Sequence, residues 1–240
     1  MTPVDVATRG SVDARWETRV REDRRRAAGL QTLSQRQATE TILQRALAVG
    51  AEAVVLTGST VRARRTASSD LDFVVVGERP NLGGVDEDVD VYAAGADAFW
   101  KRLVAGDDYI QWTLRFGWVL HDDGILHAAS DHIQETGLTP SAERKLTQAH
   151  RGLSLARLVL DSGDLDAARE QCRAALTTVA RWLLIANGVL PLSRDELSDQ
   201  ALALGYPDLA TTLRRLIHDY PRGEELRTGL EIGERLISFS

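Results

Sequence analysis

Residues 53 to 92 contain three short strand-like segments, and each of them adjoins a polar or acidic motif. An apolar run, AVVL, leads into Thr57-Gly58-Ser59. A run rich in β-branched residues, DLDFVVVG, occupies residues 70–77. Residues 88–92, DVDVY, alternate polar and apolar side chains with period two, as expected of a strand with one buried face. This stretch predicts a small mixed β-sheet and excludes an all-helical chain.

Beyond about residue 124 the periodicity becomes helical. Within residues 164–187 the apolar residues recur at steps of three and four and form one continuous stripe, made of Leu165, Ala168, Cys172, Ala175, Val179, Leu183 and Ala186. We therefore predict an α+β fold with two domains. Residues 1–123 are expected to form a small mixed sheet flanked by helices, including N-terminal helices over residues 12–49 and a last strand at 118–121. Residues 124–240 are expected to form an all-α helical bundle.

Composition narrows the classes of function. The formal net charge of −6 argues against a chain whose main task is to coat nucleic acid or an anionic membrane. Cys172 is the only cysteine, so a disulfide framework is excluded. We find neither an apolar stretch long enough to span a bilayer nor the apolar segment of a signal peptide at Met1 to Gly10. The expected location is the cytoplasm, with neither nucleic acid nor membrane as a partner.

Two pairs of aspartates stand at strand spacing in the sheet-forming stretch. Asp70 and Asp72 project from one face of their strand, and Asp88 and Asp90 share a face of another, because side chains alternate along a strand. Three carboxylates that converge repel one another unless a divalent cation neutralises them, and hard oxygen ligands select Mg²⁺ or Mn²⁺. A pair of such ions stabilises the attacking and leaving oxygens of an in-line displacement at phosphorus.

The Gly-Ser turn supplies a second part of the same chemistry. Gly58 would let the backbone approach a phosphate, and Ser59 would present its hydroxyl and backbone N–H groups to the same anion. A strand with two solvated acids is the simpler interpretation of Asp-x-Asp alone. A glycosyltransferase of the Asp-x-Asp type is another, although its acids usually close an apolar strand, whereas Asp70 and Asp72 open one. The presence of Gly58-Ser59 and of Asp90 favours the metal site.

Together these residues resemble the motif of the polymerase-β-like nucleotidyltransferase superfamily, which consists of Gly-Ser, a spacer, Asp-x-Asp and a later Asp on another strand. The resemblance implies catalytic and metal-binding roles for Asp70, Asp72 and Asp90, and nucleotide-binding roles for Gly58, Ser59, Arg62 and Ser69. Ala63 stands where the family often has glycine. Asp90 is favoured as the third acid because it lies between two valines, and Asp88 stays open as the alternative.

The layout also looks like the small-molecule and minimal branches of that superfamily, in which a short catalytic domain precedes a helical bundle. This resemblance implies that the protein transfers AMP from ATP to a hydroxyl of an acceptor and releases pyrophosphate, with Mg²⁺ or Mn²⁺ as the required ion. An aminoglycoside-like small molecule is the first expectation for the acceptor and a protein side chain the second. Asp90 would accept the hydroxyl proton. Glu170 is a candidate for an acceptor-side base only as an acid on a long helix.

Other functions stay open at the level of sequence. One is a protein-adenylylating or antitoxin-like minimal nucleotidyltransferase. Another is a non-catalytic module that binds a nucleotide or a protein through its helical half. An apolar face of the bundle can dock within its own chain or in a second copy, so a homodimer is also open. A polymerase that extends nucleic acid is disfavoured, because the chain has little room for a template-binding domain and carries net negative charge.

Overall fold

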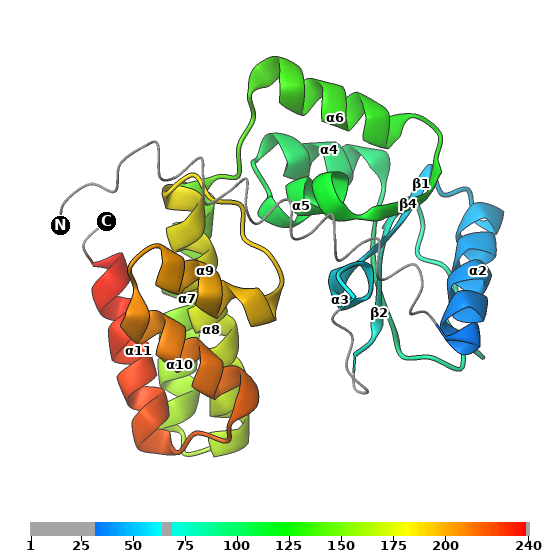
Figure 1. Cartoon of the computed structure of the whole chain (residues 1–240). Helices are drawn as coiled ribbons and strands as arrows, with labels where there is room; N and C mark the ends of the chain where they lie inside the picture. The colour runs from blue at the N-terminus through cyan, green and yellow to red at the C-terminus, as the bar shows by residue number, and fades with distance from the viewer. Residues whose placement is uncertain (1–31, 64–68, 239–240) are drawn as a thin grey trace. The chain divides into compact units, whose positions relative to one another are not determined.

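A computed structural model of the chain describes residues 32–63 and 69–238 (Figure 1). Contacts divide the described chain into two units, of which one ends at Pro140 and the other begins at Ser141. The first part of the helix predicted over residues 12–49 lies outside the described residues. Its second part is helix α2 (Leu33–Ala48), which begins at Thr32 with a capping box formed with Gln35.

The first unit contains the sheet. Its elements after α2 are β1 (Ala53–Thr57), α3 (Gly58–Val61), β2 (Leu71–Val76), β3 (Val89–Ala94), α4 (Ala96–Val104), α5 (Asp108–Phe116), β4 (Trp118–Asp122) and α6 (Ile125–Thr136). The strand order is β3-β2-β1-β4. Strand β1 is antiparallel to both β2 and β4, while β2 and β3 are parallel. The predicted small mixed sheet is therefore confirmed.

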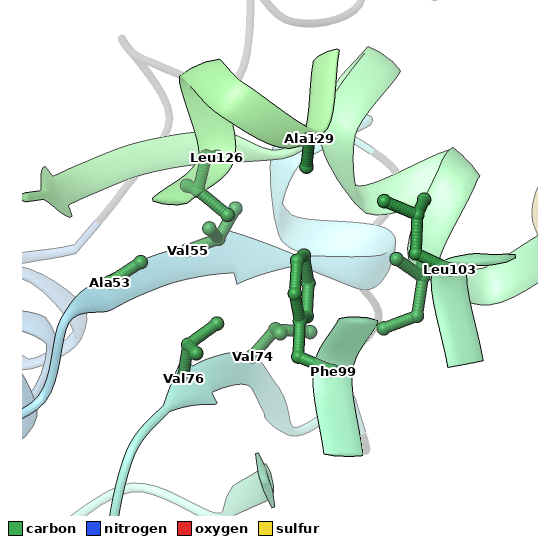
Figure 2. Close-up of a cluster of buried hydrophobic side chains, with 9 residues drawn as sticks. Ala53, Val55, Val74, Val76, Phe99, Leu103, Leu126 and Ala129 are labelled. Atoms are coloured by element: carbon green, nitrogen blue, oxygen red, sulfur yellow. The ribbon is translucent and has the colours of Figure 1, made fainter. Parts of the chain in front are cut away.

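Helices cover both faces of this sheet. Val55 of β1 and Val74 of β2 point to the face on which Phe99 of α4 and Leu126 of α6 complete a buried core (Figure 2). Removing side chains of this size from water contributes about 1.5–3 kcal/mol each. Helix α2 packs against β1 and β2 and lies on the other side of the sheet from α4 and α5 (Figure 1). This double cover explains why the β2 run VVV is apolar on both faces.

Helix α6 packs with the sheet. Leu126 and Ala129 belong to the same core as Phe99, and the Asp122 carboxylate accepts hydrogen bonds from the first turns of the helix, including one of 3.0 Å from the Leu126 N–H. Contacts thus group α6 with the unit that ends at Pro140, whereas the sequence interpretation assigned residues 124–240 to the bundle. Periodicity predicts that a segment is helical, but it does not say which partner its apolar side meets.

Over residues 141–238 the regular elements of the second unit are all helical, as predicted for the second half of the chain. It consists of α7 (Ala142–Asp161), α8 (Leu165–Ala186), the short 3₁₀ turn η1 (Arg194–Glu196), α9 (Leu197–Ala203), α10 (Pro207–His218) and α11 (Gly223–Ile237). Helix α8 packs along α7, and α11 packs on both. The predicted stripe of α8 is buried along its length except at its two ends, where Leu165 and Ala186 are exposed. Within residues 32–63 and 69–238, every helix is too short or too polar to traverse a lipid bilayer.

Candidate metal centre

The register of the sheet aligns the acidic motif with its neighbours. Asp72 of β2 pairs with Asp90 in the parallel ladder and with Thr57 of β1 in the antiparallel one. Residues paired across a sheet share a face, so these three side chains project from the same face as Val74 and Val76. Under the helices that face is apolar and fully buried. Toward the first residues of β2 and β3 it becomes acidic.

Three carboxylates meet at this end of the sheet. One oxygen from each of Asp70, Asp72 and Asp90 lies within 4.8 Å of the other two. Asp70 and Asp72 are half-buried and Asp90 is exposed, so the cluster is accessible from solvent. Among the described residues the group contains Asp90 and not Asp88. Because all of the donors are hard oxygens, the set fits Mg²⁺ or Mn²⁺ better than a metal that prefers nitrogen or sulfur ligands.

Gly58 makes room for one of these acids. Its φ of +70° is in the left-handed region that glycine adopts without strain, and a Cβ added there would lie 1.8 Å from Oδ2 of Asp72. Any side chain at this position would therefore displace the carboxylate. The sequence interpretation linked the glycine to close approach of a phosphate. The structure shows a close approach to Asp72, and contact of Gly58 with a nucleotide stays a prediction.

The other residues with predicted nucleotide-binding roles differ in accessibility. Ser59 in α3 and Ser69, directly before Asp70, are half-buried. Arg62, at the end of α3, has 0% of its surface exposed and is one of the largest fully buried side chains. A fully buried guanidinium is not presented to solvent as a phosphate-binding group. The nucleotide-binding roles of Ser59, Arg62 and Ser69 stay predictions.

Tyr109, the second residue of α5, is part of the site although the sequence analysis did not single it out. Its hydroxyl lies 3.2 Å from Oγ1 of Thr57. Burial raises the pKa of the Tyr109 phenol, and the negative charges of Asp72 and Asp90 raise it further, against the lowering effect of the hydrogen bond with Thr57. Sequence analysis could predict a helix start at Asp107 but not that this helix begins beside the acids.

Glu170 does not stand out as an acceptor-side base. Its carboxylate is 63% exposed and forms an ion pair with Arg173, one turn further along α8. An i,i+3 pair of this kind is a common feature of a solvated helix face. The position of Glu170 on a long helix is thus explained without a catalytic role.

Comparisons with known proteins add little to this description. Neither protein-family models nor curated proteins give a match. Among solved structures, the chain is similar to a nucleotidyltransferase-like protein from Exiguobacterium sibiricum 255-15, with 17% identity and a TM-score of 0.42, over 85% of this chain and 74% of that one. At this TM-score the similarity carries no argument about activity, and we infer function from the acidic side chains themselves.

Proposed function

We propose that the chain is a Mg²⁺-dependent nucleotidyltransferase that transfers a nucleoside monophosphate, AMP from ATP in the first instance, to a hydroxyl group and releases pyrophosphate. The observation that carries the proposal is the convergence of Asp70, directly before β2, with Asp72 and Asp90 on the parallel strands β2 and β3, within 4.8 Å. When bound, divalent cations would neutralise these acids and stabilise the attacking and leaving oxygens of an in-line displacement. Asp70 and Asp72 would hold them, and Asp90 would complete the site.

The reaction balances with the groups present. The acceptor hydroxyl oxygen attacks the α-phosphorus and forms a new P–O bond. The bond from that phosphorus to the oxygen bridging to the β-phosphorus breaks, and pyrophosphate leaves with the electron pair. The hydroxyl proton passes to Asp90, whose exposed carboxylate can return it to solvent. Positioning and charge neutralisation supply most of the rate in such chemistry, so the carboxylates account for the main requirements of the site.

The charges that flank the site favour a cationic small molecule as the acceptor. Asp86, Asp88 and Asp90 are exposed and Glu87 is half-buried, so four acids occur within five consecutive residues at the start of β3. A surface lined by one sign of charge raises the local concentration of ligands of the other sign. An aminoglycoside-like compound, with several amines and hydroxyls, has the required chemistry. A hydroxyl of a protein side chain is the alternative acceptor.

Nucleotide binding is the first test. Thermal shift is measured with ATP, GTP, CTP and UTP, with and without Mg²⁺, on the wild type and on Asp70→Asn/Asp72→Asn. We expect a Mg²⁺-dependent shift with ATP that the double variant lacks. A folded wild-type protein that shows no shift with any nucleotide, and no pyrophosphate release with any acceptor, would instead favour the non-catalytic partner-binding module.

Turnover is the second test. Pyrophosphate release is measured with ATP, Mg²⁺ and a panel of aminoglycosides and other polyamino alcohols. Asp70→Asn should lower the rate by about 10³-fold, the order expected when a preorganised charge-stabilising group is lost. Asp97→Asn is the matched control, because Asp97 is an exposed acid in the first turn of α4, outside the acidic cluster. Substantial activity in Asp70→Asn would rule out the proposed mechanism.

A further inference from the structure

A chain of hydroxyl groups connects α5 to the backbone of the metal centre. The hydroxyl of Tyr109 lies 3.2 Å from Oγ1 of Thr57, and that Oγ1 lies 3.2 Å from the carbonyl oxygen of Asp72. A carbonyl oxygen can only accept, so the single hydroxyl hydrogen of Thr57 is used toward Asp72. With the Thr57 hydrogen directed toward Asp72, Tyr109 is the donor to Thr57. The hydrogen bonds run in one direction, from the phenol to the backbone of a proposed metal ligand.

The start of α5 is held firmly enough to give this chain a defined geometry. Oδ1 of Asp107 accepts from the backbone N–H groups of Tyr109 and Ile110 at 3.1 and 3.2 Å. Oδ2 of Asp107 accepts from Nε and Nη2 of Arg102 at 3.0 and 2.8 Å. The Arg102 guanidinium lies 4.4 Å from the centre of the Tyr92 ring, and Tyr92 meets Tyr109 edge to face with ring centres 6.2 Å apart. These contacts restrict the Tyr109 ring in both position and tilt.

The carboxylate of Asp72 has little freedom to compensate for a shift of its own backbone. On one side it lies against Gly58, where an added Cβ would be only 1.8 Å from Oδ2. On its strand, Asp72 is paired with Asp90 and Thr57 in the two adjoining ladders. A displacement of the Asp72 carbonyl is therefore transmitted to the oxygen that faces Asp70 and Asp90.

We propose that Tyr109 is a positioning residue for the metal centre, acting through Thr57 to hold Asp72 in the geometry that binds a divalent cation. This inference rests on the proposed function in so far as it requires the metal centre. A purely structural role for Tyr109 predicts a different result. In that case its hydroxyl would contribute to the stability of the metal-free protein and would leave the affinity for the cation unchanged.

The test measures Mn²⁺ binding to the full chain by the loss of the free-ion electron paramagnetic resonance signal, together with the Tm of the metal-free protein. Tyr109→Phe keeps the ring and removes the phenol hydroxyl. Thr57→Val removes the hydroxyl that links Tyr109 to the Asp72 carbonyl. Each should weaken Mn²⁺ binding about five-fold, a modest effect because both hydrogen bonds are long for hydroxyl donors. The metal-free Tm should stay close to that of the wild type.

Two matched controls and one double variant sharpen the result. Thr57→Ser retains the relay hydroxyl and should restore near wild-type affinity. Tyr92→Phe removes the hydroxyl of the neighbouring ring but keeps the ring over which the Arg102 guanidinium lies, and should leave affinity unchanged. Because Tyr109 and Thr57 act in series, the double variant Tyr109→Phe/Thr57→Val should bind Mn²⁺ about as well as either single variant.

The outcomes separate this inference from the proposed function. Wild-type affinity in Tyr109→Phe, with Mn²⁺ binding abolished in Asp70→Asn/Asp72→Asn, would overturn the positioning role and leave the metal centre standing. Equal, negligible binding by the wild type and the aspartate double variant would overturn both. If Tyr109→Phe fails to fold, Thr57→Val decides, since it leaves the ring intact, and unchanged affinity in that folded variant would overturn the positioning role.

Discussion

Ion pairs between arginines and carboxylates lie along the helix surfaces of the helical unit, whereas at one end of the sheet three carboxylates lie close to one another. Arg157 and Glu234 are 2.8 Å apart. By contrast, Asp70, Asp72 and Asp90 share a space of 4.8 Å. Like charges held together cost free energy unless a cation offsets the repulsion. One oxygen of each acid can reach a shared cation, so this end of the sheet is the place to look for a metal ion.

Glycines in the two units show the same contrast. A Cβ at Gly233 of α11 would lie 2.7 Å from a methyl group of Leu176 and 3.0 Å from one of Leu153, so this glycine lets apolar side chains pack closely. At Gly58 the group that occupies the space is the carboxylate of Asp72. Gly233 thus allows close packing that stabilises the bundle, whereas Gly58 leaves room for the carboxylate of a proposed metal ligand.

The largest effect expected in this comparison is on bundle stability. Leu176 is fully buried and its methyl groups occupy the space left by Gly233 and Gly229. Leu176→Ala should lower the free energy of unfolding by about 3 kcal/mol, through lost burial and the cavity that remains. Urea denaturation followed by circular dichroism measures this loss. Mn²⁺ affinity should not change, and a change would show that the two units are not separate in this respect.

Substitution of Gly58 should mainly affect function. Gly58→Ala forces the Asp72 carboxylate aside and should reduce pyrophosphate release about 10²-fold, as small displacements of reacting groups do. The matched control is Gly84→Ala, because Gly84 has the same φ of +70° but no atom within 4 Å of an added Cβ. Both variants carry the backbone strain and only one the collision. Equal loss of activity in the two would contradict the assignment.

A smaller, pH-dependent effect is expected at Cys172. Burial raises the pKa of this thiol from 9.0 to about 11. Because the unfolded chain ionises first, the stability contributed by the protonated thiol is complete below pH 9 and is lost as the pH rises toward 11. At pH 10 this loss is about 1 kcal/mol. The free energies of unfolding of the wild type and of Cys172→Ala, measured by urea denaturation, should approach each other as the pH rises. A constant difference between them would contradict the raised pKa of the thiol.

The smallest effect is expected from breaking a surface ion pair of the bundle. The Arg157 and Glu234 side chains are 26% and 43% exposed, so water screens their attraction. Glu234→Gln should lower the free energy of unfolding by about 0.5 kcal/mol, and by less at high salt. Urea denaturation at two salt concentrations measures both values. A loss of several kcal/mol would mean that the Arg157–Glu234 ion pair stabilises the bundle far more than an exposed ion pair normally does.

Several features could be predicted because they depend on residues close together in the chain. Period two placed Asp70 and Asp72 on one face of a strand, and steps of three and four marked the buried stripe of α8. These patterns also predicted the mixed sheet followed by helices, which the structure confirms. The spacing of side chains along a regular element is a local property, so sequence by itself determined the fold class and the two adjacent acids.

Tertiary structure decided what depends on residues far apart in the chain. The parallel register of β2 and β3 sets Asp90 beside Asp72, and packing of α5 brings Tyr109 to the same end of the sheet. Packing also grouped α6 with the sheet and buried Arg62. Periodicity shows that a segment has an apolar face but not which surface covers that face. Strand register and helix packing are set by contacts between residues that are far apart in the chain. The arrangement of lowest free energy is therefore a property of the whole unit and cannot be read from one segment.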